Sequence, residues 1–256
     1  MVPDEMDSEI VRASNLNCGY GGEVVIKGLN FSVPAGRITT VAGLSGSGKT
    51  TLLKTLTGLI PPIEGEVYFS GQKIDYRSET SLNRLYQRIG VLYQNGALLN
   101  SLNLYQNVAL PVRMLHPQIP KKILREMVFN RLSQVGLMDS STKMPSELSG
   151  GMRKRGALAR ALILDPDVVF CDEPSSGLDP ITSGSLDELL VEMRDTFRMT
   201  LVVVTHEVRS IERISDQVLL LHGGRLFFAG EMAAISASDD RFLRAFFLRK
   251  ENEDDS

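Results

Sequence analysis

A glycine-rich run that ends in lysine and threonine contains the residues of this chain best suited to chemistry. Residues 43–50 read GLSGSGKT and fill every position of the pattern G-x-x-x-x-G-K-[S/T]. Glycines let backbone N–H groups wrap around a phosphate at a helix N-terminus, where the helix dipole favours anions. Lys49 would reach the β- and γ-phosphates, and the Thr50 hydroxyl would serve Mg²⁺. A strand pattern before the run and a helical pattern after it favour a phosphate-binding loop over a chance glycine-rich turn. The nucleotide-binding residues expected from this loop are Gly43, Ser45, Gly46, Gly48, Lys49, Thr50 and Thr51.

Two adjacent carboxylates follow an apolar run later in the chain. Residues 168–173 read VVFCDE. At the tip of a strand, Asp172 would lie near the metal, and Glu173 would polarise the attacking water. Because strands often end in charges, this run alone is weak evidence. Together with the phosphate-binding loop it predicts a site that hydrolyses a nucleoside triphosphate.

The elements that must position these residues alternate between apolar strands and helices. Strand patterns occur at 10–42, 89–93, 168–173 and 201–206, with hairpins at 65–74 and 217–230. Helical patterns occur near 103–110, 120–136, 150–164 and 181–196, from about 207, and at 239–249. Such alternation indicates a parallel sheet covered on both faces. The helical block at 95–165 is then an insertion between strands, which gives one domain with two lobes.

Composition and charge exclude several classes of protein. The chain has 256 residues, 43% of them hydrophobic, which is typical of a globular protein. A net charge of −3 offers no basic surplus for binding nucleic acid. Cys18 and Cys171 lie far apart without metal-ligand spacing, so we expect two reduced thiols. The start MVPDEMDSE is acidic, unlike a signal peptide, and the chain has no apolar run long enough to span a bilayer. If the protein works on a membrane, another chain must supply the membrane part.

A second pair of glycines stands in front of a helical pattern, at Ser149-Gly150-Gly151. With Leu148 before it and Asp172-Glu173 soon after, this stretch resembles the signature motif of ATP-binding cassette (ABC) ATPases. In that family the glycines bring backbone N–H groups to the phosphate of an ATP held by the other subunit. The resemblance therefore implies a head-to-tail homodimer with two shared sites.

The resemblance covers roughly residues 10–230 and implies a fold. The expected fold class is α/β, a P-loop NTPase with a mostly parallel core sheet, an N-terminal antiparallel β part and an inserted helical subdomain. We expect a single ABC ATPase domain over 1–256. Its parts would be a core at about 10–94 and 165–230, a helical subdomain at about 95–164, and a C-terminal helix and acidic tail at about 231–256.

Further family residues fall at matching positions. Tyr20 would stack on adenine, although a buried core tyrosine is the alternative. Gln94 would sense metal and water, and Thr50, Gln94 and Asp172 would hold Mg²⁺. Asp179, in the stretch SGLD, matches the loop that contacts the partner subunit. His206 would contact the γ-phosphate, although a lone histidine is more often structural. The resemblance thus implies ATP and Mg²⁺ as cofactors and Glu173, His206 and Gln94 as the catalytic residues.

One departure from the family points to a subfamily. The family commonly has glutamine after the signature glycines, and this chain has Met152. Residues 148–161, 93–98, 107–111 and 179–182 resemble the ATPase of Mla-type (MCE-associated) lipid transporters. The basic residues Arg153, Lys154 and Arg155 would either draw phosphate to the helix start or form a solvated face.

The subfamily resemblance implies partners and a location. Two copies of the chain would sit under two MlaE-like permease subunits at the cytoplasmic face of the bacterial inner membrane. The system would move phospholipid between that membrane and a periplasmic MCE-domain protein, and a small STAS-domain subunit would bind the helical lobe. An ABC transporter for another solute is the alternative. Soluble ABC proteins that act on DNA or the ribosome usually carry two cassettes or a long coiled coil, which this chain lacks. A nucleotide-binding regulator without turnover is disfavoured by Glu173 and His206.

Two apolar groups are candidates for contacts. Leu98, Leu99, Leu102 and Leu104 would form an exposed docking groove for a short permease helix, or would pack inside the helical lobe. Phe242, Phe246 and Phe247 on the last predicted helix would pack on the core, with contact to a dimer partner as the alternative.

Overall fold

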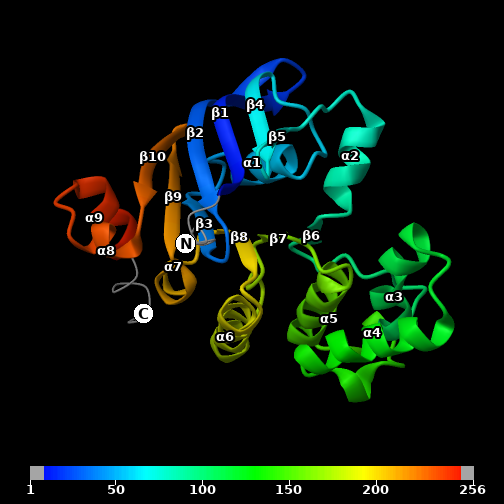
Figure 1. The fold of residues 1–256 in the computed structure, drawn as a ribbon. Coiled ribbons are helices and arrows are strands. Elements are labelled where there is room, and N and C mark those ends of the chain that lie inside the picture. The colour runs from blue at the N-terminus through cyan, green and yellow to red at the C-terminus, as the bar shows by residue number, and fades with distance from the viewer. Residues whose placement is uncertain (1–8, 249–256) are drawn as a thin grey trace, which may run out of the picture.

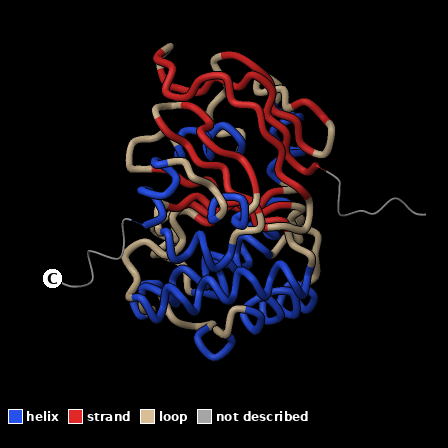
Figure 2. Tube along the Cα trace, turned by 90° about the vertical axis from the view of Figure 1, so that its left-hand side faces the viewer, coloured by secondary structure: helices blue, strands red, loops and turns tan. Residues whose placement is uncertain are grey.

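Two lobes make up the molecule, one that contains two β-sheets and one that is helical (Figure 1). The computed structural model describes residues 9–248. The acidic start and the acidic tail expected from the sequence lie outside these residues. A view turned by 90° shows the strands gathered in one half of the molecule and the helices mainly in the other (Figure 2).

The core sheet has six strands in the order β10-β9-β3-β8-β7-β6. Its pairs are parallel except for the hairpin of β9 and β10. The strands are β3 (Ile38–Gly43), β6 (Ile89–Leu92), β7 (Val168–Asp172), β8 (Thr200–Thr205), β9 (Gln217–His222) and β10 (Arg225–Gly230). Both faces are covered, because Leu201 and Val203 pack into one hydrophobic cluster while Val202 and Val204 pack into another. Burial on both faces explains the unbroken apolar runs of the central strands.

The second sheet is antiparallel, with the order β2-β1-β4-β5. Its strands are β1 (Glu9–Tyr20), β2 (Glu23–Pro34), β4 (Glu64–Phe69) and β5 (Gln72–Lys73). It shares a hydrophobic cluster with one face of the core sheet and with α1 (Lys49–Leu56), the helix that follows the glycine-rich loop. The loop is thus held between two sheets.

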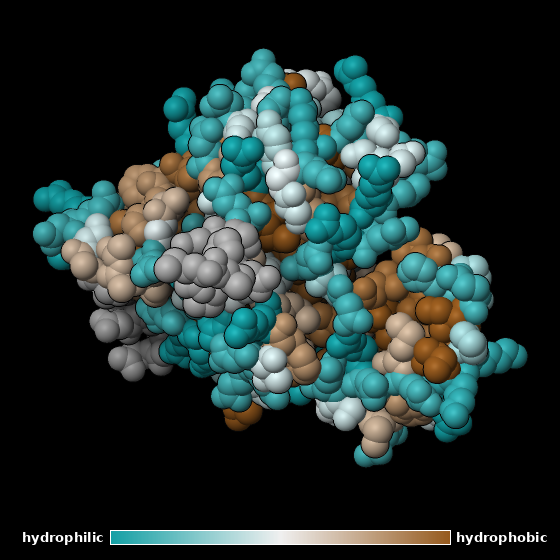
Figure 3. Space-filling view, in the orientation of Figure 1, coloured by the Kyte–Doolittle hydropathy of each residue, from teal (hydrophilic) through white to brown (hydrophobic). Residues whose placement is uncertain are grey.

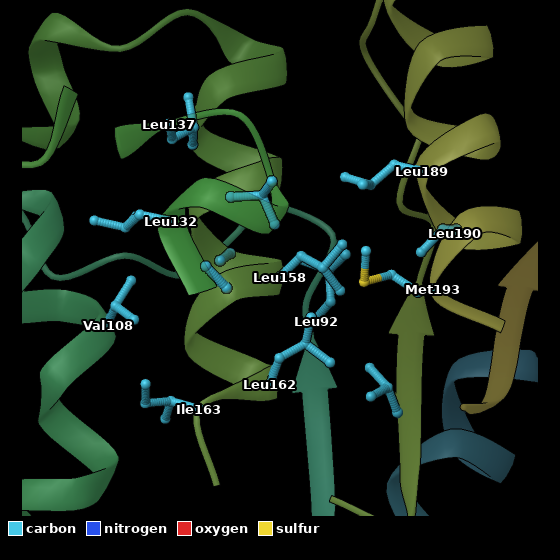
Figure 4. Packing of buried hydrophobic residues seen from close by; sticks show 14 of the residues in the cluster. Leu92, Val108, Leu132, Leu137, Leu158, Leu162, Ile163, Leu189, Leu190 and Met193 are labelled. Carbon is cyan, nitrogen blue, oxygen red and sulfur yellow. The ribbon is translucent and has the colours of Figure 1, made fainter. Parts of the chain in front are cut away.

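The helical lobe is built from α3 (Leu104–Leu115), α4 (Lys121–Gln134) and α5 (Gly150–Leu162). Its hydrophobic cluster continues into the core sheet and α6 (Pro180–Phe197), as Leu92, Leu158 and Leu190 show in Figure 4. Because one cluster spans both lobes, α5 is packed against the core as well as against its own lobe.

A buried amide organises the segment that leads into α3. The side chain of Asn107 is fully buried. Its Oδ1 accepts from the Leu99 N–H at 2.7 Å, and its Nδ2 donates to the carbonyls of Leu99, Leu102 and Asn103. These bonds satisfy backbone groups that would otherwise lack partners inside the protein.

The C-terminal part packs on the β9–β10 hairpin. It contains α7 (Val208–Ile214), α8 (Met232–Ser236) and α9 (Arg241–Leu248). Phe246 is buried in a cluster with residues of β9, and Phe242 and Phe247 pack against that cluster. The expectation that these aromatics pack on the core is confirmed.

The structure differs from the expectations at one additional helix, at the end of α3 and at Leu104. Helix α2 (Glu79–Tyr86) is absent from the expected elements because it is only eight residues long, although Leu82, Leu85 and Tyr86 stand at helical spacing. The helix expected to end near residue 110 continues through Pro111 to Leu115. Leu104, expected in an exposed groove, is fully buried in the lobe cluster.

Candidate functional site

Four neighbouring strands bring the candidate residues to one edge of the core sheet. In the order β3-β8-β7-β6, these parallel strands end at the glycine-rich loop, at His206, at Asp172 and Glu173, and just before Gln94. Carboxyl ends of parallel strands meet at the same edge, which is where open α/β sheets bind ligands. A pocket of 340 Å³ lies there, lined by Val25, Ser45, Gly46, Ser47, Gly48, Lys49, Thr50, Thr51, Gln94, Glu173 and His206.

The glycine-rich loop has a backbone that only glycine adopts easily. Gly46 has φ 78° and Gly48 has φ 99°, both in the left-handed region. Gly48 also lies close to Ile26, since a Cβ on it would be 2.6 Å from Ile26 Cγ1. Helix α1 starts at Lys49 without a side-chain cap. Its first N–H groups are therefore available to an anion.

Lys49 is buried beside the two carboxylates. Its Nζ donates to the carbonyl oxygens of Gly43 at 2.8 Å and Leu44 at 3.2 Å, and lies 4.0 Å from Glu173 Oε1. Burial lowers the pKa of Lys49, and the charges of Glu173 and Asp172 oppose that shift. The side chain can exchange its two carbonyl partners for phosphate oxygens without leaving the pocket.

Asp172 has a buried carboxylate oxygen, Oδ1, without a hydrogen-bond partner. Burial raises the pKa of Asp172, the Glu173 charge raises it further, and Lys49, Lys54 and Lys154 oppose the shift. A buried, unpaired carboxylate oxygen is unfavourable unless a proton, water or cation meets it. An oxygen-seeking cation such as Mg²⁺ fits this position. The described residues contain no group of three or more His, Cys, Asp or Glu side chains arranged to hold a metal.

Glu173 has an unusual backbone and a close histidine. Its φ is +45°, in the left-handed region where a residue with a side chain is strained. Its N–H donates to the Val204 carbonyl at 2.8 Å. Its Oε1 lies 2.9 Å from His206 Nδ1, with the Glu173 side chain 12% exposed and that of His206 58% exposed. A carboxylate held at the pocket wall in this way can accept a proton from water that approaches a phosphate.

Gln94 and Tyr20 occupy different places relative to the pocket. Gln94 lines it, and its Nε2 donates to Ser176 Oγ at 3.3 Å. Tyr20, at the end of β1, does not line the pocket among the described residues. Tyr20 is 47% exposed, so the alternative of a buried tyrosine is wrong. The Nζ of Lys54 lies 5.6 Å from the Tyr20 ring centroid.

The second glycine pair lies at the start of α5, in the helical lobe. Ser149 caps the helix, its Oγ accepting from the Met152 N–H at 3.2 Å. Within the part of the chain that the structure describes, Ser149, Gly150 and Gly151 do not line the pocket. A Cβ on Gly151 would lie 2.4 Å from Thr182 Cγ2 on α6, so this glycine is needed for close packing.

Asp179 caps α6. Its Oδ1 accepts from the N–H groups of Ile181 and Thr182, and its Oδ2 accepts from Thr182 Oγ1. The hydrogen bonds from Thr182 lower the pKa of Asp179. The loop between Glu173 and α6 is therefore fixed at its C-terminal end.

The basic run after the signature motif is not a uniformly solvated face. Lys154 is buried, and its Nζ donates to the backbone carbonyls of Gln94 and Glu173. Arg155 is half-buried and donates to Val135 and Ser185, so only Arg153 of the three is exposed. The helical period contained this signal, since Lys154 stands three and four residues before the buried Ala157 and Leu158.

Comparisons with known proteins identify the family. The model of the ABC transporter family matches residues 26–176. The chain is similar to the "Intermembrane phospholipid transport system ATP-binding protein MlaF" of Haemophilus influenzae, with 38% identity over 97% of this chain and 93% of the relative. The protein of the same name from Escherichia coli is 40% identical over 93% of this chain and 88% of the relative.

Solved structures agree with this result. CbiO1 of Clostridium perfringens, part of an ABC transporter complex, has a TM-score of 0.84 and 29% identity, covering 96% of this chain and 97% of that one. A dimeric ATP-binding cassette in a post-hydrolysis state with ADP and Pi has a TM-score of 0.78 and 28% identity, covering 87% and 98%. With its phosphate-binding loop at the edge of a parallel sheet and relatives that match nearly its whole length, this chain belongs to the ABC transporter family as an ATP-binding cassette ATPase.

Proposed function

We propose that this chain is the ATP-hydrolysing subunit of a bacterial ABC transporter that moves phospholipid between the inner membrane and a periplasmic MCE-domain partner. The observation that carries the substrate is the name shared by relatives 38% and 40% identical over nearly the whole chain. The observation that supports turnover is the Glu173 carboxylate, held between Lys49 and His206 in the pocket.

The phosphate-binding loop holds ATP in this proposal. Backbone N–H groups of residues 45–51 bind the phosphates, and Lys49 binds the β- and γ-phosphates. Tyr20 would stack on adenine with its exposed ring. Thr50, Gln94 and Asp172 would hold Mg²⁺, which when bound neutralises phosphate charge. Glu173 takes the proton of the attacking water, and His206 contacts the γ-phosphate.

A second copy of the chain completes each site in this proposal. Ser149, Gly150 and Gly151 would cover the γ-phosphate bound by the partner subunit, and Asp179 would lie in the loop that contacts that subunit. The position of the signature residues away from their own pocket supports this arrangement, and so does the dimeric state of the structurally similar post-hydrolysis cassette. Closure of the dimer on ATP and reopening after hydrolysis would drive the transporter.

The membrane part would come from other chains. Among the described residues, no helix has the length and apolar character needed to cross a bilayer. We propose that the chain binds MlaE-like permease subunits at the cytoplasmic face of the inner membrane, together with an MCE-domain protein and a small STAS-domain subunit. The permease contact would be the segment 97–104, where Leu99 is exposed and Leu98 and Leu102 are half-buried. Figure 3 shows hydrophobic residues at the surface of the helical lobe (brown, right).

Two experiments test this function. Lipid mass spectrometry on the tagged chain, extracted gently with its membrane partners, should find phospholipid together with an MlaE-like permease and an MCE protein. A different permease without lipid would keep the ATPase and assign it to another solute. Phosphate release by the same complex should fall about 100-fold or more in Glu173→Gln, because that variant loses the general base. Equal, near-zero phosphate release by wild type and variant would contradict the proposal that ATP hydrolysis by this chain drives transport.

A further inference from the structure

One lysine of the helical lobe is buried without an ion pair among the residues that the structure describes. Lys154, in the second turn of α5, is 5% exposed. Buried lysines are rare unless they are paired, because removing an ammonium group from water is unfavourable. Burial lowers the pKa of Lys154, and the charges of Asp172 and Glu173 oppose that shift. Such a position calls for a reason other than stability.

The partners of Lys154 are backbone carbonyls of the two loops that carry the candidate chemistry. Its Nζ donates to the carbonyl oxygen of Gln94 and, at 3.2 Å, to that of Glu173. Gln94 follows β6 and Glu173 follows β7, so one ammonium group joins two adjacent strand ends. Gln94 and Glu173 both line the pocket.

The bond to Glu173 acts on a strained residue. With φ at +45°, Glu173 keeps this conformation only if its surroundings hold it there. Its N–H donates to the Val204 carbonyl, and its C=O accepts from the Lys154 ammonium and from the Ser176 N–H, both at 3.2 Å. With both backbone polar groups held, the carboxylate is directed toward Lys49 and His206.

Helix α5, which carries Lys154, also forms hydrogen bonds to the segment after Gln94. The guanidinium of Arg160 donates to the carbonyls of Ala97 at 2.7 Å and Gly96 at 3.1 Å. The backbones approach closely, since a Cβ on Gly90 of β6 would lie 2.4 Å from the Ala161 carbonyl oxygen. Figure 4 shows Leu158 and Leu162 of α5 beside Leu92 of β6. Ser149, Lys154 and the carbonyls of Gly96 and Ala97 are therefore all held by the same helix.

We propose that Lys154 is a positioning residue for hydrolysis, which couples the placement of the helical lobe to the direction of the Glu173 carboxylate through the carbonyls of Gln94 and Glu173. The inference rests on the proposed role of Glu173. A shift of α5 changes the bond on the Glu173 carbonyl, so hydrolysis is fast only when the lobe and the signature motif are in place. ATP binding at the glycine-rich loop does not depend on this bond.

The test compares Lys154→Met, which keeps the length and removes the donor, with Lys154→Arg, which keeps a cation with several donors. Lys122→Met is the matched control, because Lys122 is an exposed lysine of the same lobe. The chain is purified with its membrane partners. Steady-state phosphate release gives kcat and the KM for ATP, and thermal unfolding gives Tm.

We expect Lys154→Met to lower kcat about tenfold or more, since small errors in catalytic geometry have effects of this size. The KM for ATP should stay within about threefold, because the loop that binds ATP is unchanged. Tm should stay nearly unchanged, because the gain from removing a buried cation offsets the loss of its hydrogen bonds to the two carbonyls. Lys154→Arg should recover most of kcat, and Lys122→Met should match wild type.

A kcat for Lys154→Met equal to that of wild type would overturn the inference, as would a loss that follows a lower Tm or that Lys154→Arg does not recover. If Lys154→Met does not fold, Lys154→Leu, which also lacks a donor, takes its place, and a kcat unchanged from wild type again overturns the inference. Absence of hydrolysis in wild type would contradict the proposed function instead. Hydrolysis that is lost in Glu173→Gln but unchanged in the Lys154 variants would leave that function intact.

Discussion

The two glycine-rich helix starts of this chain look alike in sequence and are built differently. In the loop before α1, Gly46 and Gly48 have positive φ, and no side chain caps the helix. At the start of α5, Gly150 and Gly151 are the first helical residues, neither has positive φ, and Ser149 caps the helix. At Gly151 a side chain is instead excluded by Thr182, because a Cβ there would lie 2.4 Å from Thr182 Cγ2. The first region needs glycine for its backbone conformation, and the second needs it for space.

Lys49→Ala tests the first region with the largest expected effect. Lys49 is the cation that faces Glu173 inside the pocket, and its loss removes the charge that binds phosphate. ATP hydrolysis should fall about 100-fold or more, as for the loss of a group that stabilises developing charge. Phosphate release and fluorescent nucleotide binding measure it. Undiminished hydrolysis in this variant would overturn the assignment of the site.

Gly48→Ala should affect folding and nucleotide binding together. A residue with a side chain at φ 99° is strained by about 1–3 kcal/mol. The new Cβ would also meet Ile26. Adding Ile26→Ala removes the Cγ1 and Cδ1 atoms that the new Cβ would meet, so it relieves only the contact and should restore neither Tm nor nucleotide affinity. Full recovery in the double variant would mean that crowding, and not the backbone, requires this glycine.

Gly151→Ala should behave in the opposite way. Its Cβ would strike the Thr182 methyl group, and overpacking of this kind is destabilising by about 1–3 kcal/mol. Thr182→Ser removes the methyl and keeps the hydroxyl that donates to Asp179. The double variant should therefore regain most of the lost Tm. Failure to regain it would show that the two glycine pairs have the same physical role after all.

Asp172→Asn should have the smallest effect on stability, and we expect the change in Tm to depend on pH. Burial and the Glu173 charge raise the pKa of Asp172 above its unfolded value. The folded protein thus binds this proton more tightly, and stability falls as pH rises through the interval between the two pKa values. In the absence of nucleotide, Asn should raise Tm at pH 8, and the gain should shrink as pH falls toward the raised pKa. Thermal unfolding at several pH values checks this, and a constant gain would argue against titration of Asp172.

The residues that could be predicted from sequence are those whose type and place along the chain carry the signal alone. GLSGSGKT needs no tertiary context, and the strand ends at Asp172, Gln94 and His206 follow from apolar runs that are buried on both faces. That these ends share one edge follows from parallel pairing.

The features that were not predicted depend on direction in space. Lys154 looked like part of a basic face, but the helix turns it inward while Arg153 points outward. The burial of Leu104 depends on packing within the lobe, and a hydrophobic spacing does not distinguish an exposed groove from a core. Helix α2 has the Ser78 cap and the helical spacing of Leu82, Leu85 and Tyr86 as signals, but it is only eight residues long.

The buried amide of Asn107 sets the backbone shape of the segment proposed to contact the permease, and the exposed side chains of that segment take no part in setting it. Its side chain fixes the backbone of residues 99–103 from the interior, while Leu99 and Asn100 are exposed on the outside. The outer side chains can therefore be exchanged without changing the path of the chain. For the proposed permease contact, this means that substitutions of the exposed side chains would change the contact surface and leave the backbone shape that the buried amide sets.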